Sequence, residues 1–113
     1  MINDIRISPH FKLREFQCRC CGLVKLSPRL LQMLEELREE AEIPLVVTSG
    51  YRCPAHNRRV GGAPRSLHVE GCAADILAAP EAQKRLFAMA KSVGFSQVIC
   101  GGFKKYLHLG YKN

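Results

Sequence analysis

Three side chains that commonly bind metal ions stand in two short motifs of this chain. His68 and Asp75 lie in SLHVEGCAAD, and His108 lies in YLHLGY near the C-terminus. The residues around Asp75 predict a short buried strand, made of Ala73, Ala74, Ile76, Leu77 and Ala78. An ionised carboxylate in such a strand costs several kcal/mol unless it is paired or bound to a metal. Asp75 therefore indicates a cation partner.

The spacing between His68 and Asp75 restricts how both could bind one ion. Ligand atoms on a tetrahedral zinc ion lie roughly 3 to 4 Å apart, because zinc–ligand bonds are about 2.0 Å long. The chain between the two residues would span ~23 Å if extended and ~10 Å as a helix. A chain reversal between them is therefore needed, and Gly71 is the residue that permits one.

His108 is predicted to point away from the core. Strand alternation in YLHLGY puts Leu107 and Leu109 on the core face, and Tyr106 and His108 on the opposite face. Two neutral imidazoles and one carboxylate leave a zinc site with a net charge of about +1 and an open position for water, as in catalytic zinc sites. Hydrolysis of an amide is the first hypothesis, although other divalent ions bind the same ligands.

Apolar periodicity and helix caps predict the helices and strands around these residues. Ser27 and Pro28 predict the start of a long helix, and Pro44 predicts its end. The segment 10–22 has irregular apolar spacing and is expected to pack through Phe11, Leu13 and Phe16. The predicted helices span residues 28–43, 54–60 and 80–93, and the predicted strands span residues 44–50, 73–78, 96–100 and 106–111. This order predicts an α+β fold with a small, mainly antiparallel sheet flanked by helices.

Length and composition bound the class of protein. The chain has 113 residues, of which 47% are hydrophobic, so residues 1–113 are expected to form a single domain, which we expect to be a monomer. No run approaches the roughly 18 apolar residues of a membrane span, and no signal peptide is evident, so cytoplasmic synthesis is expected. The net charge of +7 favours polyanionic partners, which include nucleic acid, anionic membranes and bacterial wall polymers.

Six cysteines are many for this length, and three of them crowd into CRCCG. In a cytoplasmic protein they are expected to be mostly reduced thiols. Cys18, Cys20 and Cys53 are candidate ligands of a second, structural metal ion, although their spacing differs from that of common zinc fingers. A disulfide formed after release from the cell is the alternative.

The motifs SGYRCPAHN, SLHVEGCAAD and YLHLGY follow one another along the chain. Together they resemble the zinc D-Ala-D-Ala carboxypeptidase family, the hedgehog-type metallopeptidases that include phage endolysins. The resemblance extends from FKLREFQC to the C-terminus, and it implies a hedgehog and DD-peptidase-like fold. It also implies that His68, Asp75 and His108 bind Zn²⁺, that Arg52 binds a substrate carboxylate, and that Ser66 supports the ligand loop or the substrate.

The general base is where the sequence departs from the family pattern. Family members commonly carry an acid shortly before the last histidine ligand, but SQVICGGFKKYLHLG contains none. Gly101 occupies the position of the acid, and Tyr106 occupies that of a second histidine found in some members. Tyr106 could donate a hydrogen bond to an oxyanion, and Glu70 is the acid nearest in sequence to a ligand. His56 is a further candidate by chemistry.

The leading hypothesis is a zinc peptidase that cleaves peptidoglycan stem peptides, either as a D-Ala-D-Ala carboxypeptidase or as an endopeptidase. A phage endolysin, released to the cell wall through a partner pore, would reconcile an absent signal peptide with an external substrate. The first alternative is a non-catalytic zinc-binding recognition module of the same fold. A cysteine-rich, basic nucleic-acid binder is the least favoured, because it leaves Asp75 unexplained.

Overall fold

The computed structural model describes residues 3–112. Within this range the helices are α1 (Pro28–Ala41), α2 (Pro54–Arg59) and α3 (Pro80–Val93), with short 3-10 helices η1 (Leu13–Phe16) and η2 (Gly102–Lys104). The strands are β1 (Arg6–Ser8), β2 (Phe11–Lys12), β3 (Val47–Ser49), β4 (Ala73–Leu77), β5 (Gln97–Cys100) and β6 (Tyr106–Gly110). No helix within residues 3–112 is long and apolar enough to cross a membrane.

Four strands form the larger sheet, in the order β3-β4-β6-β5, and each neighbouring pair is antiparallel. The register places Asp75 of β4 directly opposite His108 of β6 and opposite Ser49 of β3. β5 and β6 form the hairpin that the sequence predicts. The predicted α+β fold with a small antiparallel sheet is confirmed.

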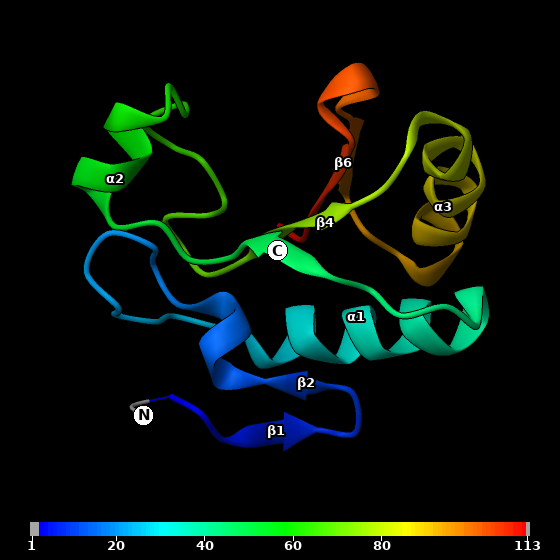
Figure 1. The fold of residues 1–113 in the computed structure, drawn as a ribbon, viewed down its shortest axis with the longest axis horizontal. Helices are drawn as coiled ribbons and strands as arrows, with labels where there is room; N and C mark the ends of the chain where they lie inside the picture. Colours follow the sequence, from blue (N-terminus) through cyan, green and yellow to red (C-terminus); the bar gives the residue numbers. More distant parts are fainter. Residues whose placement is uncertain (1–2, 113) are drawn as a thin grey trace.

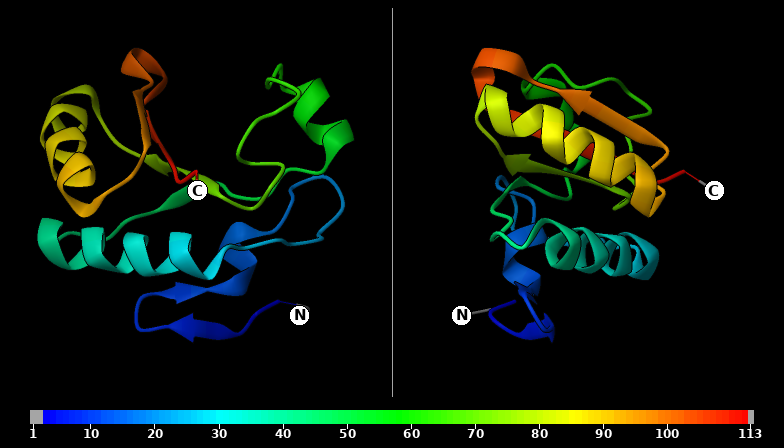
Figure 2. Two further views of the ribbon diagram at one scale, coloured as in Figure 1. Left: turned by 180° about the vertical axis from the view of Figure 1, so that it is seen from behind. Right: turned by 90° about the vertical axis from the view of Figure 1, so that its right-hand side faces the viewer.

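The core lies between this sheet and two helices. Leu107 and Leu109 of β6 and Ile76 of β4 are fully buried against side chains of α1 and α3. Full burial of one such side chain contributes about 2 kcal/mol to folding. The β1–β2 hairpin lies on the other side of α1 from the sheet (Figures 1 and 2). The opposite face of the sheet, which carries Asp75 and His108, is left free of α1 and α3.

The N-terminus of α1 is as predicted. The C-terminus of α1, and the segment 10–22 that precedes the helix, differ in part from the prediction. Ser27 accepts a hydrogen bond from the Leu30 N–H, so it is the N-cap, and Pro28 is the first helical residue. The helix ends at Ala41 because Glu42 adopts a left-handed conformation with φ of 56°. Segment 10–22 packs through the buried Phe11 and Phe16, as expected, whereas Leu13 is only partly buried. Phe11 also takes part in β2 of a small antiparallel hairpin that the sequence analysis did not predict.

The surroundings of Asp75 also differ from the sequence prediction. Leu77 was expected to be buried with the rest of the strand, but it is 56% exposed. The reason is alternation: Leu77 shares a sheet face with Asp75, whereas Ala74 and Ile76 face the core. Asp75 therefore does not lie in the apolar core, and the side chains that bury it come from elsewhere in the chain.

Candidate functional site

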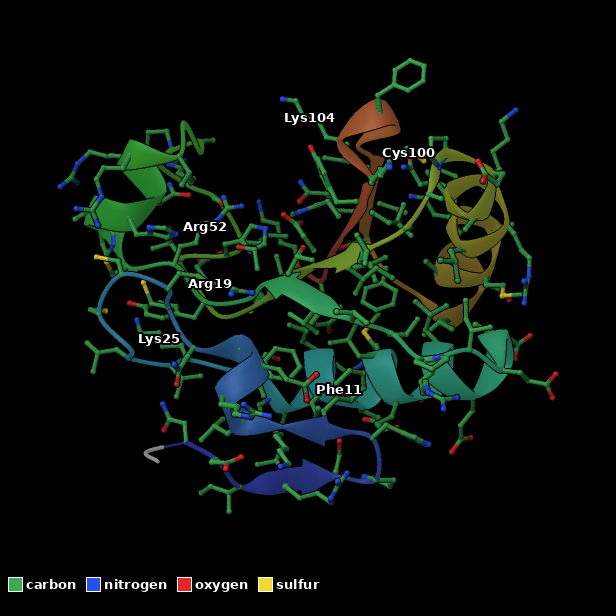
Figure 3. The ribbon with its side chains drawn as sticks, viewed as in Figure 1. Phe11, Arg19, Lys25, Arg52, Cys100 and Lys104 are labelled. Carbon is green, nitrogen blue, oxygen red and sulfur yellow. The ribbon has the colours of Figure 1, made fainter. Side chains whose placement is uncertain are left out.

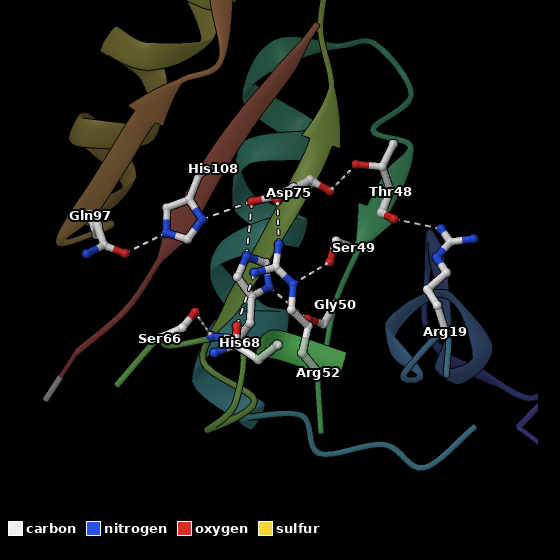
Figure 4. Close-up of polar contacts among 11 residues, drawn as sticks. Arg19, Thr48, Ser49, Gly50, Arg52, Ser66, His68, Asp75, Gln97 and His108 are labelled. Carbon is white, nitrogen blue, oxygen red and sulfur yellow. Dashed lines mark hydrogen bonds and ion pairs between the residues drawn. The ribbon is translucent and has the colours of Figure 1, made fainter. Parts of the chain in front are cut away.

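His68, Asp75 and His108 converge on the free face of the sheet (Figure 4). β4 and β6 carry Asp75 and His108 as direct partners, and His68 comes from the turn before β4. Asp75 Oδ1 lies 2.9 Å from His108 Nδ1 and 3.2 Å from His68 Nε2. One ligand atom from each residue lies within 4.8 Å of those of the other two. The structure thus brings together the three residues predicted as metal ligands.

A compact turn over residues 66–72 returns the chain from His68 to Asp75. Backbone hydrogen bonds among residues 66–72 hold it. Gly71 has a φ of +74°, and a Cβ there would lie 2.7 Å from backbone atoms of Lys25, so another residue would be strained for both reasons. Ser66 Oγ accepts a 3.2 Å hydrogen bond from the His68 N–H. Ser66 therefore contacts the ligand loop, which is one of the two roles expected of it.

Each imidazole is oriented through its other ring nitrogen. His68 Nδ1 lies 2.8 Å from the carbonyl oxygen of Gly50, which can only accept, so Nδ1 carries a proton. His108 Nε2 lies 2.5 Å from Gln97 Oε1, which is likewise an acceptor. In the neutral imidazoles, the lone pairs of His68 Nε2 and His108 Nδ1 then face Asp75. Metal-binding histidines are characteristically held in this way.

This donor set fits a divalent cation. Two imidazole lone pairs and a carboxylate oxygen repel one another at 2.9 and 3.2 Å unless a proton or a metal ion lies among them. Donors on a tetrahedral zinc ion are about 3.3 Å apart. Burial alone would raise the pKa of Asp75. When the ring nitrogens of His108 and His68 that face it carry protons, their hydrogen bonds and charge outweigh burial and hold the pKa of Asp75 well below the ordinary value. Asp75 is therefore an anionic donor at neutral pH.

Arg52 lies beside the three residues and is held by several contacts (Figure 4). Its guanidinium donates to Asp75 Oδ2 at 3.4 Å, to Ser49 Oγ at 3.2 Å and to Asn57 Oδ1 at 3.3 Å. The backbone N–H of Arg52 also donates to the carbonyl oxygen of His68. These contacts fix a planar cation next to the candidate metal centre, where it could bind a carboxylate.

A hollow of about 470 Å³ opens onto this centre. Arg52, Ser66 and Tyr106 line it together with the three candidate ligands, and Asp75 is the only acid among the described residues that line it. Glu70 is exposed and lines a neighbouring hollow of about 600 Å³. His56, on α2, does not line the hollow at the candidate centre. The structure therefore does not bring Glu70 or His56 to the three ligands.

Tyr106 occupies the space that a side chain at position 101 would need. A Cβ built on Gly101 would lie 2.4 Å from two atoms of the Tyr106 ring. Tyr106 in turn lines the hollow at the candidate metal centre. The position at which an acid was expected from the family resemblance is thus closed by an aromatic ring in this chain.

Residues 9–110 match the family described as Peptidase M15. This chain belongs to the peptidase M15 family. The match covers nearly the whole described chain, so the resemblance seen in the motifs is confirmed. M15 proteins are zinc-dependent metallopeptidases, which agrees with a site of two histidines and one aspartate. No match was found among curated proteins.

Sequence reasoning missed two residues of this M15 site. Gln97 contacts His108 from β5, and the Gly50 carbonyl contacts His68 from the end of β3. The predicted β5–β6 hairpin could have indicated Gln97, since Ile99 pairs with His108 and residues two apart share a face. A backbone carbonyl has no side-chain signature, so nothing in the sequence marks Gly50 for this role.

The second predicted ligand group also lies together in this M15 chain. The Sγ atoms of Cys18, Cys20 and Cys53 are within 4.8 Å of one another. Burial by itself would raise the pKa of Cys18, but backbone hydrogen bonds from Cys53, Cys21 and Cys20 lower it to about 7. A substantial fraction of Cys18 is therefore thiolate at neutral pH.

Proposed function

We propose that this chain is a zinc peptidase that hydrolyses peptidoglycan stem peptides. The observation that carries the proposal is the convergence of His68, Asp75 and His108 in one hollow with a fixed arginine, Arg52. Membership of the M15 family supports the class of reaction. The net charge of +7 suits a wall substrate that carries carboxylates and anionic polymers.

The proposed roles follow from the contacts of each residue. His68, Asp75 and His108 would hold Zn²⁺, which supplies Lewis acidity that activates water and polarises the scissile carbonyl. Arg52 would grip a substrate carboxylate through paired N–H donors, because its guanidinium lines the hollow. Ser66 lines the same hollow and could contact the peptide.

Tyr106 is proposed as the hydrogen-bond donor to the developing oxyanion, because it lines the hollow and its side chain ends in a hydroxyl. Replacing Tyr106 with Phe is expected to lower kcat by about 100-fold while metal content stays unchanged.

Glu70 faces a neighbouring hollow, so Glu70→Gln is expected to retain most of the activity. Loss of activity in Glu70→Gln with bound metal retained would instead identify Glu70 as the missing base.

The test of function is digestion of purified muropeptides, with products identified by mass. We expect stem-peptide cleavage by the zinc-loaded protein and none by His68→Ala. Zinc binding without cleavage at any pH would contradict the peptidase proposal and leave the fold assignment intact. The product masses identify the bond, which separates release of a terminal D-alanine from a cut within the stem.

Arg52 distinguishes the two kinds of peptidase. If it binds a terminal carboxylate, Arg52→Ala should lower kcat/KM by about 10- to 100-fold on substrates with a free C-terminus, since a hydrogen bond to a charged group contributes about 1.5 to 3 kcal/mol. Amidation of the substrate should remove most of this difference. Equal losses on free and amidated peptides would indicate an endopeptidase. Arg58→Ala, an exposed change on α2, is the matched control.

A non-catalytic zinc-binding module is the second candidate. It is favoured by one observation, that Asp75 is the only acid among the described residues that line the hollow and is itself a proposed ligand. This candidate predicts tight binding of stem peptides without turnover. Binding measured by calorimetry together with the muropeptide digestion decides between the two.

The site of action is a separate proposal. We propose that the protein is made in the cytoplasm and reaches the wall after release, as a phage endolysin would. Lysis of cells that co-express a membrane pore, and no lysis when the pore is absent, would support this proposal. Lysis that does not require the pore would contradict it.

A further inference from the structure

A second cluster of donor atoms lies where residues 18–22 meet the start of α2. Cys18, Cys20 and Cys53 have their Sγ atoms within 4.8 Å of one another, and each is a free thiol. Cys21 follows Cys20 in the sequence, and its thiol interacts electrostatically with those of Cys18 and Cys53. Four of the six cysteines in the sequence therefore gather at one place, although 35 positions separate Cys18 from Cys53. We call these four residues the cysteine cluster.

Cys18 is the centre of the cysteine cluster and is surrounded like a metal-bound thiolate. It is 1% exposed, and its sulfur accepts a hydrogen bond from the Cys53 N–H at 3.4 Å. The backbone N–H groups of Cys20 and Cys21 also favour its thiolate form. A thiol sulfur is a weak acceptor, whereas charged acceptors gain more from such donors. Residues that bind metals are themselves commonly held by an outer layer of hydrogen bonds.

The charge around the cysteine cluster also suits a metal ion bound by thiolates. Three thiolates bound to a divalent ion leave a net charge of about −1, and a fourth makes it about −2. Arg59 of α2 donates a hydrogen bond to Cys20 Sγ, which places a positive charge beside the cluster. The Cys53 sulfur accepts from the His56 N–H at 3.4 Å, so a second member also has a backbone donor.

The distances between the Sγ atoms require little adjustment for zinc binding. Sulfur atoms bound to one tetrahedral zinc ion are about 3.8 Å apart, because Zn–S bonds are about 2.3 Å long. The Sγ atoms of Cys18, Cys20 and Cys53 already lie within 4.8 Å of one another, and Cys20 and Cys21 are exposed enough to shift.

We propose that the cysteine cluster binds a structural zinc ion, with Cys18, Cys20 and Cys53 as ligands and Cys21 as the fourth donor. An all-thiolate site is closed to water and therefore stabilises the fold without taking part in hydrolysis. The ion would tie residues 18–22 to the chain immediately after Arg52, and so would hold Arg52 in its hollow. The cysteine cluster shares no residue with the three-residue centre, so this proposal stands whether or not the peptidase proposal does.

The test counts metal ions per chain, by native mass spectrometry of protein purified under reducing conditions. We expect two zinc ions in the wild type and one in His68→Ala/His108→Ala. Cys20→Ser/Cys21→Ser in that histidine-substituted background should contain none. Both replaced cysteines are exposed, so folding, checked by circular dichroism, should persist. Cys100→Ser is the matched control, because Figure 3 shows this exposed residue far from Arg19, a neighbour of the cluster in sequence.

Cobalt supplies a readout that identifies the donor atoms. Co²⁺ bound by the His68→Ala/His108→Ala variant should show intense near-ultraviolet thiolate-to-metal absorption, which Cys20→Ser/Cys21→Ser should lose. A histidine-substituted variant that contains no metal and shows no such absorption would overturn the proposal. Isolation of the stable, metal-free protein with a disulfide between Cys18 and Cys53 would overturn it as well.

Discussion

The Asp75 carboxylate contacts three side chains that can carry positive charge. Oδ1 faces His68 and His108, and Oδ2 faces Arg52 at 3.4 Å. Removing the partners of a buried charge costs about 3 to 5 kcal/mol, so these side chains hold Asp75 in its ionised form. The same carboxylate therefore links the candidate metal centre to the arginine proposed to bind substrate.

Gln97 tests whether orientation of His108 matters for metal binding. Gln97→Ala removes the acceptor at His108 Nε2 and is expected to weaken zinc affinity about 10- to 100-fold, the usual effect of losing a partner of a metal ligand. Competition with a chromogenic chelator measures this. Gln32→Ala, exposed on α1, is the control, and equal affinity of the Gln97 variant and the control would refute the role.

Among the secondary-structure elements, one connection positions His68 and a second attaches the β1–β2 hairpin to α1. The turn over residues 66–72 places His68, and Gly71 closes against the backbone of Lys25. On the other side of α1, Glu35 accepts hydrogen bonds from Ser8 and from the His10 N–H, which attach the β1–β2 hairpin to the helix. Each connection depends on one residue whose replacement can be matched with a control.

Gly71→Ala is expected to destabilise the protein by about 3 kcal/mol, because it combines a positive φ with a backbone clash. Gly61→Ala isolates the first effect, since Gly61 has a φ of +77° and open space around it, and it should cost only about 1 kcal/mol. Urea denaturation measures both. An equal decrease in the free energy of unfolding of the two variants would show that the clash with the Lys25 backbone contributes nothing to the effect of Gly71→Ala.

Glu35 predicts a pH dependence of stability. Burial opposes the charged form, but hydrogen bonds from Ser8 and His10 outweigh it, so the pKa of Glu35 lies below its ordinary value of 4.5. The stability that Glu35 contributes is therefore complete above pH 4.5 and is lost as the pH falls through the lower folded-state value.

Accordingly, Glu35→Gln should destabilise the protein by about 1 kcal/mol at pH 7 and by less at pH 3. Urea midpoints at the two pH values measure the change. Glu36→Gln, exposed on the same helix, should show little effect at either pH. A Glu35→Gln loss that is the same at pH 7 and pH 3 would be inconsistent with a lowered pKa.

At the scale of the whole molecule, the three-residue centre joins segments that meet only in the folded chain. His68 precedes β4, Asp75 lies within it, and His108 comes from β6 near the C-terminus. Such a site does not exist in the unfolded chain, so an ion bound there stabilises the fold.

Zinc at 100 times its dissociation constant for this centre should raise the free energy of unfolding by about 2.7 kcal/mol. The comparison is between wild type and His68→Ala/His108→Ala, each titrated with zinc and followed by thermal unfolding. The cysteine cluster is intact in both proteins, so the difference between them reports the histidine centre alone. Equal stabilisation of the two proteins would mean that His68 and His108 do not bind the ion.

Local sequence patterns were sufficient to predict much of the secondary structure and the candidate ligands of this protein. The helix cap at Ser27, the strand alternation around His108 and the reversal at Gly71 depend on neighbouring residues, so the sequence alone predicted them. The motifs also sufficed for the family. The β1–β2 hairpin escaped prediction because its apolar residues are irregularly spaced and Glu35 of a distant helix holds it.

The groups that surround the three candidate ligands were determined by the tertiary structure. The Gly50 carbonyl and Gln97 set the ring nitrogens that face Asp75, and Tyr106 fills the space beside Gly101. Leu77, expected to be buried, is exposed on the face that carries Asp75. These features depend on strand register and on contacts between distant segments. Periodicity within one segment carries no information about either, which is why the sequence identified the donors and the fold identified their partners.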